Sequence, residues 1–135
     1  MKIESVYKKL LSGLKETLNQ EDKNYYVGAV CLNKHGNIIS KGYNSYVKTH
    51  PEQKRFAKKS GKDFSCFLHA EIASLVRARE PVDSVMVMRV IQNGDIKMSR
   101  PCKICEMAMR EAKVRQIWYT DNEGILHSYF LGRIE

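Results

Sequence analysis

Apolar residues recur at helical spacing near the start of the chain and form short continuous runs further along it. Over residues 2–19 they return every three or four positions, which predicts an amphipathic helix. The runs 25–33 and 38–43 predict two strands, and the turn residues 35–37 between them indicate a hairpin. The chain is therefore expected to open with a helix followed by two antiparallel strands.

The remainder of the chain alternates between helical and strand patterns. Pro51 and Pro101 suit the first turn of a helix, and the pair Asn93-Gly94 is typical of a tight hairpin turn. The predicted helices span 51–60, 69–79 and 101–112, and the predicted strands span 84–91, 114–119 and 125–130. Helices that alternate with strands in this way indicate a three-layer α/β fold.

Length and composition fit one globular domain. The 135 residues include 43% hydrophobic and 28% charged side chains, which argues against a disordered chain and a disulfide-dense miniprotein. We expect residues 1–135 to form a single domain. No stretch approaches the ~18 apolar residues of a membrane span, and the N-terminal segment lacks the apolar run of a signal peptide. A soluble cytoplasmic protein is the expectation.

Basic residues outnumber acidic residues. The 23 Lys and Arg against 15 Asp and Glu give a formal net charge of +8. Such a surplus favours an anionic partner, which admits a nucleic acid, a phosphorylated small molecule or a membrane surface. Charge alone does not distinguish these classes.

Two short motifs lie where predicted helices begin: His69-Ala70-Glu71 and Pro101-Cys102-Lys103-Ile104-Cys105. Cys102 and Cys105 share one face of the first helical turn, where the helix dipole favours thiolate over thiol. Two thiolates and a neutral imidazole are good zinc ligands, and three protein ligands leave the fourth tetrahedral position for water. His69, Cys102 and Cys105 are therefore candidate ligands of a catalytic zinc ion, with Glu71 as the candidate proton carrier.

Together the two motifs resemble the H-x-E…P-C-x-x-C signature of the zinc-dependent cytidine/deoxycytidylate deaminase superfamily. The order of the predicted elements over about residues 1–120 resembles the same superfamily. The resemblance implies a three-layer α/β/α fold with a central five-stranded mixed sheet, and hydrolytic removal of an exocyclic amine as ammonia. It matches His69, Cys102 and Cys105 to the zinc ligands and Glu71 to the general acid/base.

Two substrate contacts also follow from the resemblance. Asn44, in Gly42-Tyr43-Asn44-Ser45, is similar to the Asn that touches the base or sugar in nucleotide and tRNA deaminases. The backbone N–H of Ala70 matches the donor that holds the carbonyl of the base. An Asn at the end of a strand is also a common turn residue, so both interpretations of Asn44 stay open.

A structural zinc site is the main alternative to a catalytic one. Cys66 and His69 together with Cys102 and Cys105 could form a closed four-ligand site, as in a non-catalytic zinc-stabilised binding module. That arrangement leaves Glu71 without a role, which favours the three-ligand site.

A cluster of cations precedes the first motif and offers contacts to phosphate or nucleic acid. The candidates are Lys48, Lys54, Arg55 and Lys58. They lie between Asn44 and His69, in a region that borders the mouth of the active site in this superfamily. The alternative is a solvated helix face without a ligand.

The chain also departs from the superfamily pattern. The approach to His69 is longer than in compact tRNA adenosine deaminases, and residues 93–100 add a predicted hairpin. Only residues 121–124 separate the last two strands, which suggests an antiparallel pair, as in free-nucleoside deaminases. The run Cys105-Glu106-Met107-Ala108 is instead closer to the nucleotide and tRNA branch.

We therefore expect a zinc-dependent hydrolytic deaminase that converts a cytosine nucleotide or nucleoside, such as dCMP, to the uracil product. Deamination of bases in single-stranded DNA or RNA is the second hypothesis, with contacts to the backbone from Lys54, Arg55, Lys58 and Lys59. A non-catalytic zinc-stabilised module is the third. The zinc motif argues against a membrane role, and the way in which members of the superfamily assemble leads us to expect a homo-oligomer.

Overall fold

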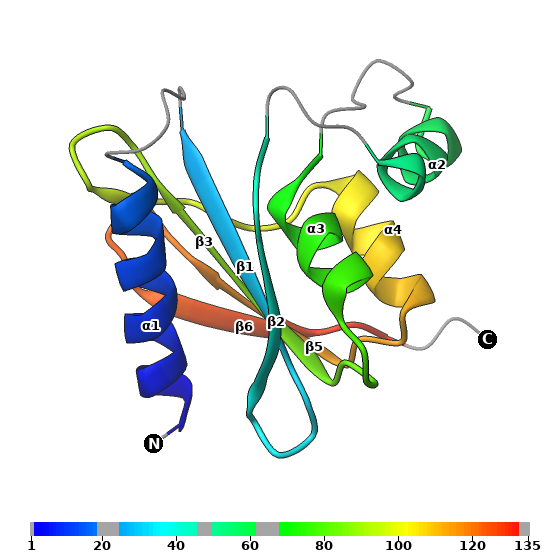
Figure 1. The fold of residues 1–135 in the computed structure, drawn as a ribbon, viewed down its shortest axis with the longest axis horizontal. Helices are drawn as coiled ribbons and strands as arrows, with labels where there is room; N and C mark the ends of the chain where they lie inside the picture. Colours follow the sequence, from blue (N-terminus) through cyan, green and yellow to red (C-terminus); the bar gives the residue numbers. More distant parts are fainter. Residues whose placement is uncertain (1, 19–24, 46–49, 62–67, 133–135) are drawn as a thin grey trace.

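A mixed β-sheet lies between one long helix and three shorter helices in the computed structural model of the chain, which describes residues 2–18, 25–45, 50–61 and 68–132 (Figure 1). The helices are α1 (Lys2–Thr17), α2 (Pro51–Lys59), α3 (Ala70–Arg77) and α4 (Lys103–Glu111). The strands are β1 (Tyr26–Leu32), β2 (Ile38–Tyr43), β3 (Ser84–Val90), β4 (Ile96–Lys97), β5 (Gln116–Thr120) and β6 (Leu126–Phe130). The expected three-layer α/β/α fold is confirmed. None of the described helices is both long and apolar enough to span a membrane.

Five strands form the sheet in the order β2-β1-β3-β5-β6, and the two-residue β4 pairs with β3 outside this path. The pair β3–β5 is parallel, whereas β1–β2, β1–β3 and β5–β6 are antiparallel. A parallel pair needs a crossover, and α4 supplies it between β3 and β5. The expected antiparallel hairpin at the end of the chain is present.

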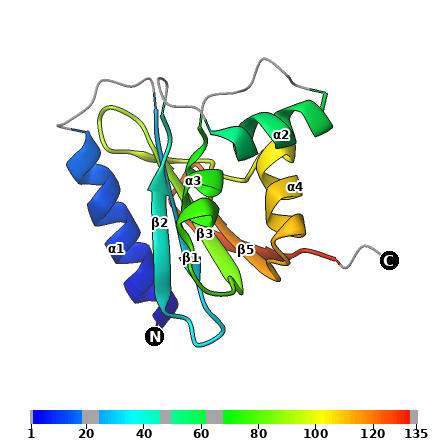
Figure 2. The same ribbon diagram turned by 45° about the vertical axis from the view of Figure 1, so that its right-hand side comes forward.

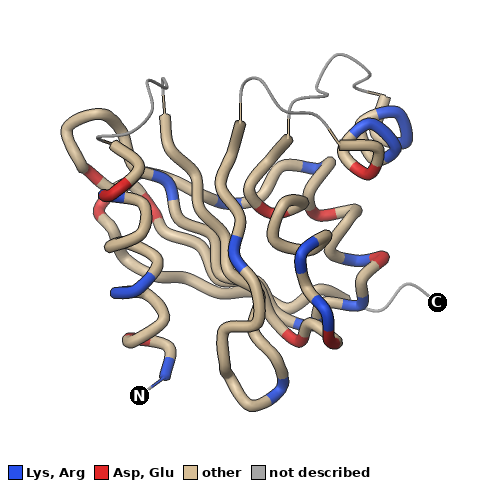
Figure 3. Tube along the Cα trace, viewed as in Figure 1, with Lys and Arg blue, Asp and Glu red and all other residues tan. Residues whose placement is uncertain are grey.

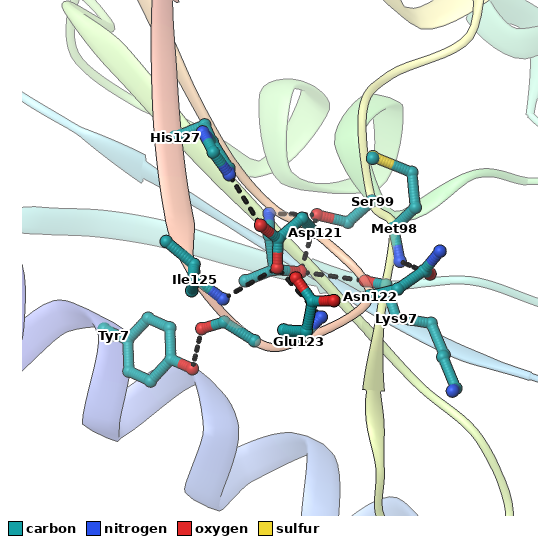
Figure 4. Close-up of polar contacts among 11 residues, drawn as sticks. Tyr7, Lys97, Met98, Ser99, Asp121, Asn122, Glu123, Ile125 and His127 are labelled. Carbon is teal, nitrogen blue, oxygen red and sulfur yellow. Dashed lines mark hydrogen bonds and ion pairs between the residues drawn. The ribbon is translucent and has the colours of Figure 1, made fainter.

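Asp121 closes the turn of this last hairpin (Figure 4). Its Oδ1 atom accepts hydrogen bonds from the backbone N–H groups of Glu123 (2.9 Å) and Ile125 (3.0 Å). Its Oδ2 atom lies 2.7 Å from Nε2 of His127 on β6. A short turn with its own side-chain acceptor leaves no room for a helix, so β6 returns directly alongside β5.

Helix α1 covers one face of the sheet. Leu10 and Leu14 on α1 are buried against Val30 on β1 and Met86 on β3. Helix and sheet approach closely at Gly28, where an added Cβ would lie 2.9 Å from a Leu10 methyl group. The helical periodicity of the N-terminal segment thus reflects a face that is buried on the sheet.

Helices α2, α3 and α4 cover the opposite face, and α2 packs against α4 (Figure 2). Helix α3 lies directly on β2 at Gly42, where an added Cβ would come within 2.5 Å of the backbone N of Ser74 and 2.7 Å of the carbonyl oxygen of Ala70. Since a side chain larger than hydrogen does not fit there, Gly42 sets the distance between β2 and the first turn of α3.

The predicted elements agree with the structure to within a few residues, with one correction. Pro101 was expected to open the last helix, but the helix begins at Lys103. Cys102 has extended backbone angles (φ −73°, ψ 170°) and is the N-cap of α4. Cys102 and Cys105 therefore lie at the N-cap and in the first turn, which still places both at the end of the helix that carries a partial positive charge.

Candidate metal centre and adjoining cleft

His69 is held at the start of α3 by its backbone. It is the N-cap of the helix, and its side chain makes no capping hydrogen bond. Its N–H donates to Oε1 of Gln53 on α2 (3.0 Å), and its carbonyl oxygen accepts from the N–H of Ala73 (2.9 Å). Because neither bond uses the imidazole, the ring is available to face α4.

The two cysteines of α4 meet this ring. Nδ1 of His69 lies 3.2 Å from Sγ of Cys105 and 3.7 Å from Sγ of Cys102. The three donor atoms lie within 4.8 Å of one another, and no other group of three metal-ligating side chains forms within the described ranges. One ion could contact all three atoms. Nitrogen and two sulfur donors on one side, with a cleft on the other, fit zinc with an open coordination position.

The pKa values of all three side chains in this cluster are shifted from their usual values. A hydrogen bond from the Cys105 thiol, together with one from His69, lowers the pKa of Cys102 to about 3. The hydrogen bond to Cys102 raises the pKa of His69. Burial is the main cause that raises the pKa of Cys105 well above its usual value. A divalent cation bound here would displace the protons that remain on His69 and Cys105, so binding is expected to release protons.

Glu71 lies in the first turn of α3, beside the cluster. Only 6% of the residue is exposed, and it lines the cleft together with His69 and Cys102. Burial raises the pKa of its carboxyl group, while the neighbouring His69 acts in the opposite direction. A buried carboxyl group whose pKa is raised is a stronger base than an exposed glutamate, which suits a residue that carries protons.

The cleft beside the cluster has a volume of about 500 Å³. It is bounded by the two helix starts, by Tyr25 and Val27 at the start of β1, by Arg89 on β3 and by Arg100 before α4. Ala70 lies in its wall as the first residue of α3, where a backbone N–H has no partner within the helix. The volume is within the range of small-molecule sites.

Asn44 lines the cleft, but its side chain also has a structural role. Its Oδ1 atom accepts from the backbone N–H of Val27 (2.9 Å), and its Nδ2 donates to the carbonyl oxygen of Tyr25 (3.3 Å). These bonds join the end of β2 to the start of β1. The next residue, Ser45, donates its N–H to the carbonyl oxygen of Leu68, directly before His69 (2.9 Å).

The expected basic contacts lie elsewhere. Lysine and arginine gather on α2 (Figure 3), where Lys54, Arg55 and Lys58 are exposed. Arg55 forms ion pairs with Glu52 on its own helix and with Glu111 on α4. None of these three cations is among the described residues that line the cleft beside Glu71. Lys48 and Cys66 lie outside the described residues.

Two residues of the site were not singled out from the sequence. Gln53 is fully buried inside a helix that otherwise reads as a basic surface. Arg89 interrupts the apolar strand β3 and lines the cleft. The available signal for Arg89 was its alternation with Val85 and Val87, which places all three on one face of the strand.

The segment before the cysteine motif is fixed to the sheet by a buried serine (Figure 4). Oγ of Ser99 donates to the carbonyl oxygen of Val87 (2.8 Å) and accepts from the N–H of Thr120 (2.7 Å). The N–H of Met98 donates to Oδ1 of Asn122 (2.9 Å). These bonds place the residues that lead into α4 across the ends of β3 and β5.

The sequence model of the cytidine and deoxycytidylate deaminase zinc-binding region matches residues 1–121. Among solved structures, the chain is similar to a dCMP deaminase from the cyanophage S-TIM5 in its apo form. The two are 20% identical, the match covers 90% of this chain and 87% of that chain, and the TM-score is 0.49. A search of curated proteins found no match.

Proposed function

The chain belongs to the cytidine and deoxycytidylate deaminase zinc-binding family, and we propose that it converts a cytosine nucleotide or nucleoside, such as dCMP, to the uracil product. The observation that carries this proposal is the joint position of the metal cluster and Glu71. Three donor atoms lie within 4.8 Å of one another, and a buried carboxyl group lines the same cleft. A closed structural site would have no use for that carboxyl group.

His69, Cys102 and Cys105 would hold the zinc ion. The bound metal would supply a Lewis acid that makes water acidic enough to ionise near neutral pH. Hydrogen bonds from Cys105 and His69 lower the pKa of Cys102, which favours the thiolate form that binds metal. The electrostatics of the cluster therefore suit a cation even though Cys105 is buried.

Glu71 would carry the protons of the reaction. Its carboxylate takes one proton from water and delivers it to N3 of the base, where it remains in the product. The second proton of the water goes to the amine, the bond between C4 and the amine breaks, and ammonia leaves. The water oxygen becomes the new carbonyl oxygen at C4, so one water is consumed for each ammonia released.

The wall of the cleft would orient the base. The N–H of Ala70 points from the free end of α3 and is suited to a carbonyl acceptor. Asn44 uses part of its amide to join β1 and β2, which fixes its orientation toward any ligand. We therefore assign both residues to substrate positioning.

The test is a panel of substrates assayed with the zinc-loaded protein for ammonia release. dCMP, deoxycytidine, cytidine, a cytosine-containing DNA oligonucleotide and an adenine nucleotide are compared at equal concentration. We expect ammonia from a cytosine monomer. Protein that holds one zinc per chain and releases ammonia from none of the cytosine substrates would contradict the proposal.

Deamination of a base within a single strand is a second candidate, favoured by an aromatic cluster next to the cleft. Arg100 lines the cleft, and its Cζ lies 4.5 Å from the ring centroid of Tyr129. Tyr119 stacks on His127 with centroids 5.4 Å apart. Rings and a cation next to an active site are typical of surfaces on which unpaired bases stack.

A further inference from the structure

Arg89 lies on the face of β3 that forms the floor of the catalytic cleft. Residues of a strand alternate between faces, and Val85 and Val87 of β3 belong to the core beneath α3 and α4. Met86, Met88 and Val90 face α1 instead. Val85, Val87 and Arg89 therefore lie in one row on the face of β3 that meets the cleft. Arg89 is the charged member of this row, and the two valines are apolar.

The pairing of the strands places Arg89 close to the metal-binding end of the cleft. Arg89 pairs with Val27 on β1, and the backbone of Val27 is hydrogen-bonded to Asn44 on its other side. The row Asn44–Val27–Arg89 therefore crosses three neighbouring strands at one level. Asn44 is followed by Ser45, which is bonded to Leu68 immediately before His69. Arg89 and His69 consequently lie on two sides of the same cleft.

The guanidinium of Arg89 lacks an anionic partner. Its Nε atom is buried without a hydrogen bond, and Arg89 forms no ion pair within the residues that the structure describes. Its Cζ lies 4.5 Å from the ring centroid of Tyr25, which is a cation–π contact and not an ion pair. Buried polar groups are normally satisfied, so an unpaired arginine at a cleft indicates a ligand.

Arg100 adds a second positive charge to the same cleft. It follows Ser99, whose hydroxyl group is bonded to the carbonyl oxygen of Val87, two residues before Arg89. Its Cζ lies 4.5 Å from the ring centroid of Tyr129, and it too has no ion pair with a described carboxylate. Arg89 and Arg100 line the same cleft, and Glu71 is the one acidic side chain among its described lining residues, so the cleft offers two guanidinium groups to an anionic ligand.

We propose that Arg89, assisted by Arg100, binds the phosphate of a mononucleotide substrate while the base lies beside Glu71. This inference rests on the proposed deaminase function and identifies its substrate as a nucleoside monophosphate. Guanidinium groups bind phosphate through paired, charge-assisted hydrogen bonds, which suits Arg89 because its Nε has no hydrogen-bond partner among the described residues. Arg55 on α2 is less suited to this role, because its guanidinium is already paired with Glu52 and Glu111.

The first experiment measures binding of reaction products, because products are not turned over. Titration calorimetry compares dUMP with deoxyuridine for the zinc-loaded wild type and Arg89→Met. We expect the Kd of dUMP to rise on the order of 10- to 100-fold, as for loss of a hydrogen bond between charged groups. The Kd of deoxyuridine should change less than about 3-fold, because only the phosphate contact is removed. Arg89→Lys should retain an intermediate affinity for dUMP.

Two control variants show whether the effect belongs to the cleft. Lys9→Met removes an exposed charge on α1, on the opposite face of the sheet, and should leave both Kd values unchanged. Lys54→Met removes an exposed charge on α2 and should do the same. A loss of dUMP affinity in Lys54→Met that equals the loss in Arg89→Met would overturn the proposal. Zinc content and thermal unfolding confirm that each variant is folded.

A second experiment separates this inference from the deaminase function. Ammonia release from dCMP and deoxycytidine gives the preference for the phosphorylated substrate, which should fall about 10-fold or more in Arg89→Met. If Arg89→Met deaminates both substrates with the same preference for dCMP as wild type, the proposed phosphate site is wrong and the proposed deaminase function is retained. If dUMP binding depends on Arg89 but no substrate releases ammonia, the deaminase function is wrong and the phosphate site stands. If Arg89→Met bound a cytosine-containing oligonucleotide more weakly than wild type but bound dUMP equally well, the mononucleotide site would also be overturned.

Discussion

Replacement of Gly42 by alanine tests whether the packing of α3 on β2 positions the metal centre. The added Cβ would lie 2.5 Å from the backbone N of Ser74 and 2.7 Å from the carbonyl oxygen of Ala70. Both atoms belong to the backbone of α3, so rotation of a side chain cannot relieve the contact. Helix α3 must move away from β2, and His69 and Glu71 at its start must move with it.

The cost follows from this geometry. Forcing an extra carbon into a packed interface costs about 1–3 kcal/mol. The lower entropy of the unfolded chain returns about 0.4–1 kcal/mol when glycine becomes alanine. We therefore expect the free energy of unfolding of the zinc-free protein to fall by about 1–2 kcal/mol. Because His69 shifts relative to the two cysteines, zinc affinity should fall on the order of 10-fold, as for other changes that misplace a metal ligand.

Urea denaturation measures the stability, and competition with a chromogenic chelator measures the zinc affinity. Gly132→Ala is the matched control, because an added Cβ there meets no atom within 4 Å. We expect the control to change stability by less than about 0.5 kcal/mol and to leave zinc binding unchanged. If Gly42→Ala matched this control in both measurements, the account of how β2 positions α3 would be refuted.

The remaining expectations concern the support of His69 and the last hairpin. Gln53→Leu leaves the N–H of His69 without its acceptor, so we expect the free energy of unfolding to fall by about 1–3 kcal/mol and zinc binding to weaken. Lys54→Met, at the exposed neighbouring position, is the control, and equal unfolding midpoints for the two variants would contradict this role of Gln53. Asp121→Asn tests the turn: the bond from His127, then those from the turn backbone, hold the pKa of Asp121 below its usual 3.8. A lowered folded-state pKa stabilises the fold above the unfolded value, so wild type should exceed Asp121→Asn in stability above about pH 4. The difference should shrink as pH falls further, and a difference that grew in acid would be inconsistent with this assignment.

The metal cluster could be predicted from the sequence because local rules determine where helices begin. The two motifs each stand at a helix start, and an N-cap presents its side chain away from the helix axis. The spacing of Cys102 and Cys105 then places both thiols on one side of α4. The short turn between β5 and β6 could also be predicted, because the four residues 121–124 are too few to form a helix.

Contacts between distant segments could not be predicted in the same way. Arg55 was a candidate for the active-site mouth, but α2 packs on α4 and brings Arg55 to Glu111. The role of Arg89 depends on which level of the sheet meets the cleft, and this is set by the pairing of β1 with β2 and β3. Such pairings join residues far apart in the chain, and a single sequence does not specify them.

Zinc content and ammonia release, measured side by side for wild type and Glu71→Gln, test the central claim most directly. We expect both proteins to hold one zinc per chain, because Glu71 is not one of the three clustered donors. We also expect ammonia release from the cytosine substrate to fall at least about 100-fold in Glu71→Gln, the usual cost of losing a general acid/base. Glu71→Gln protein that kept its zinc and released ammonia at the wild-type rate would contradict the account.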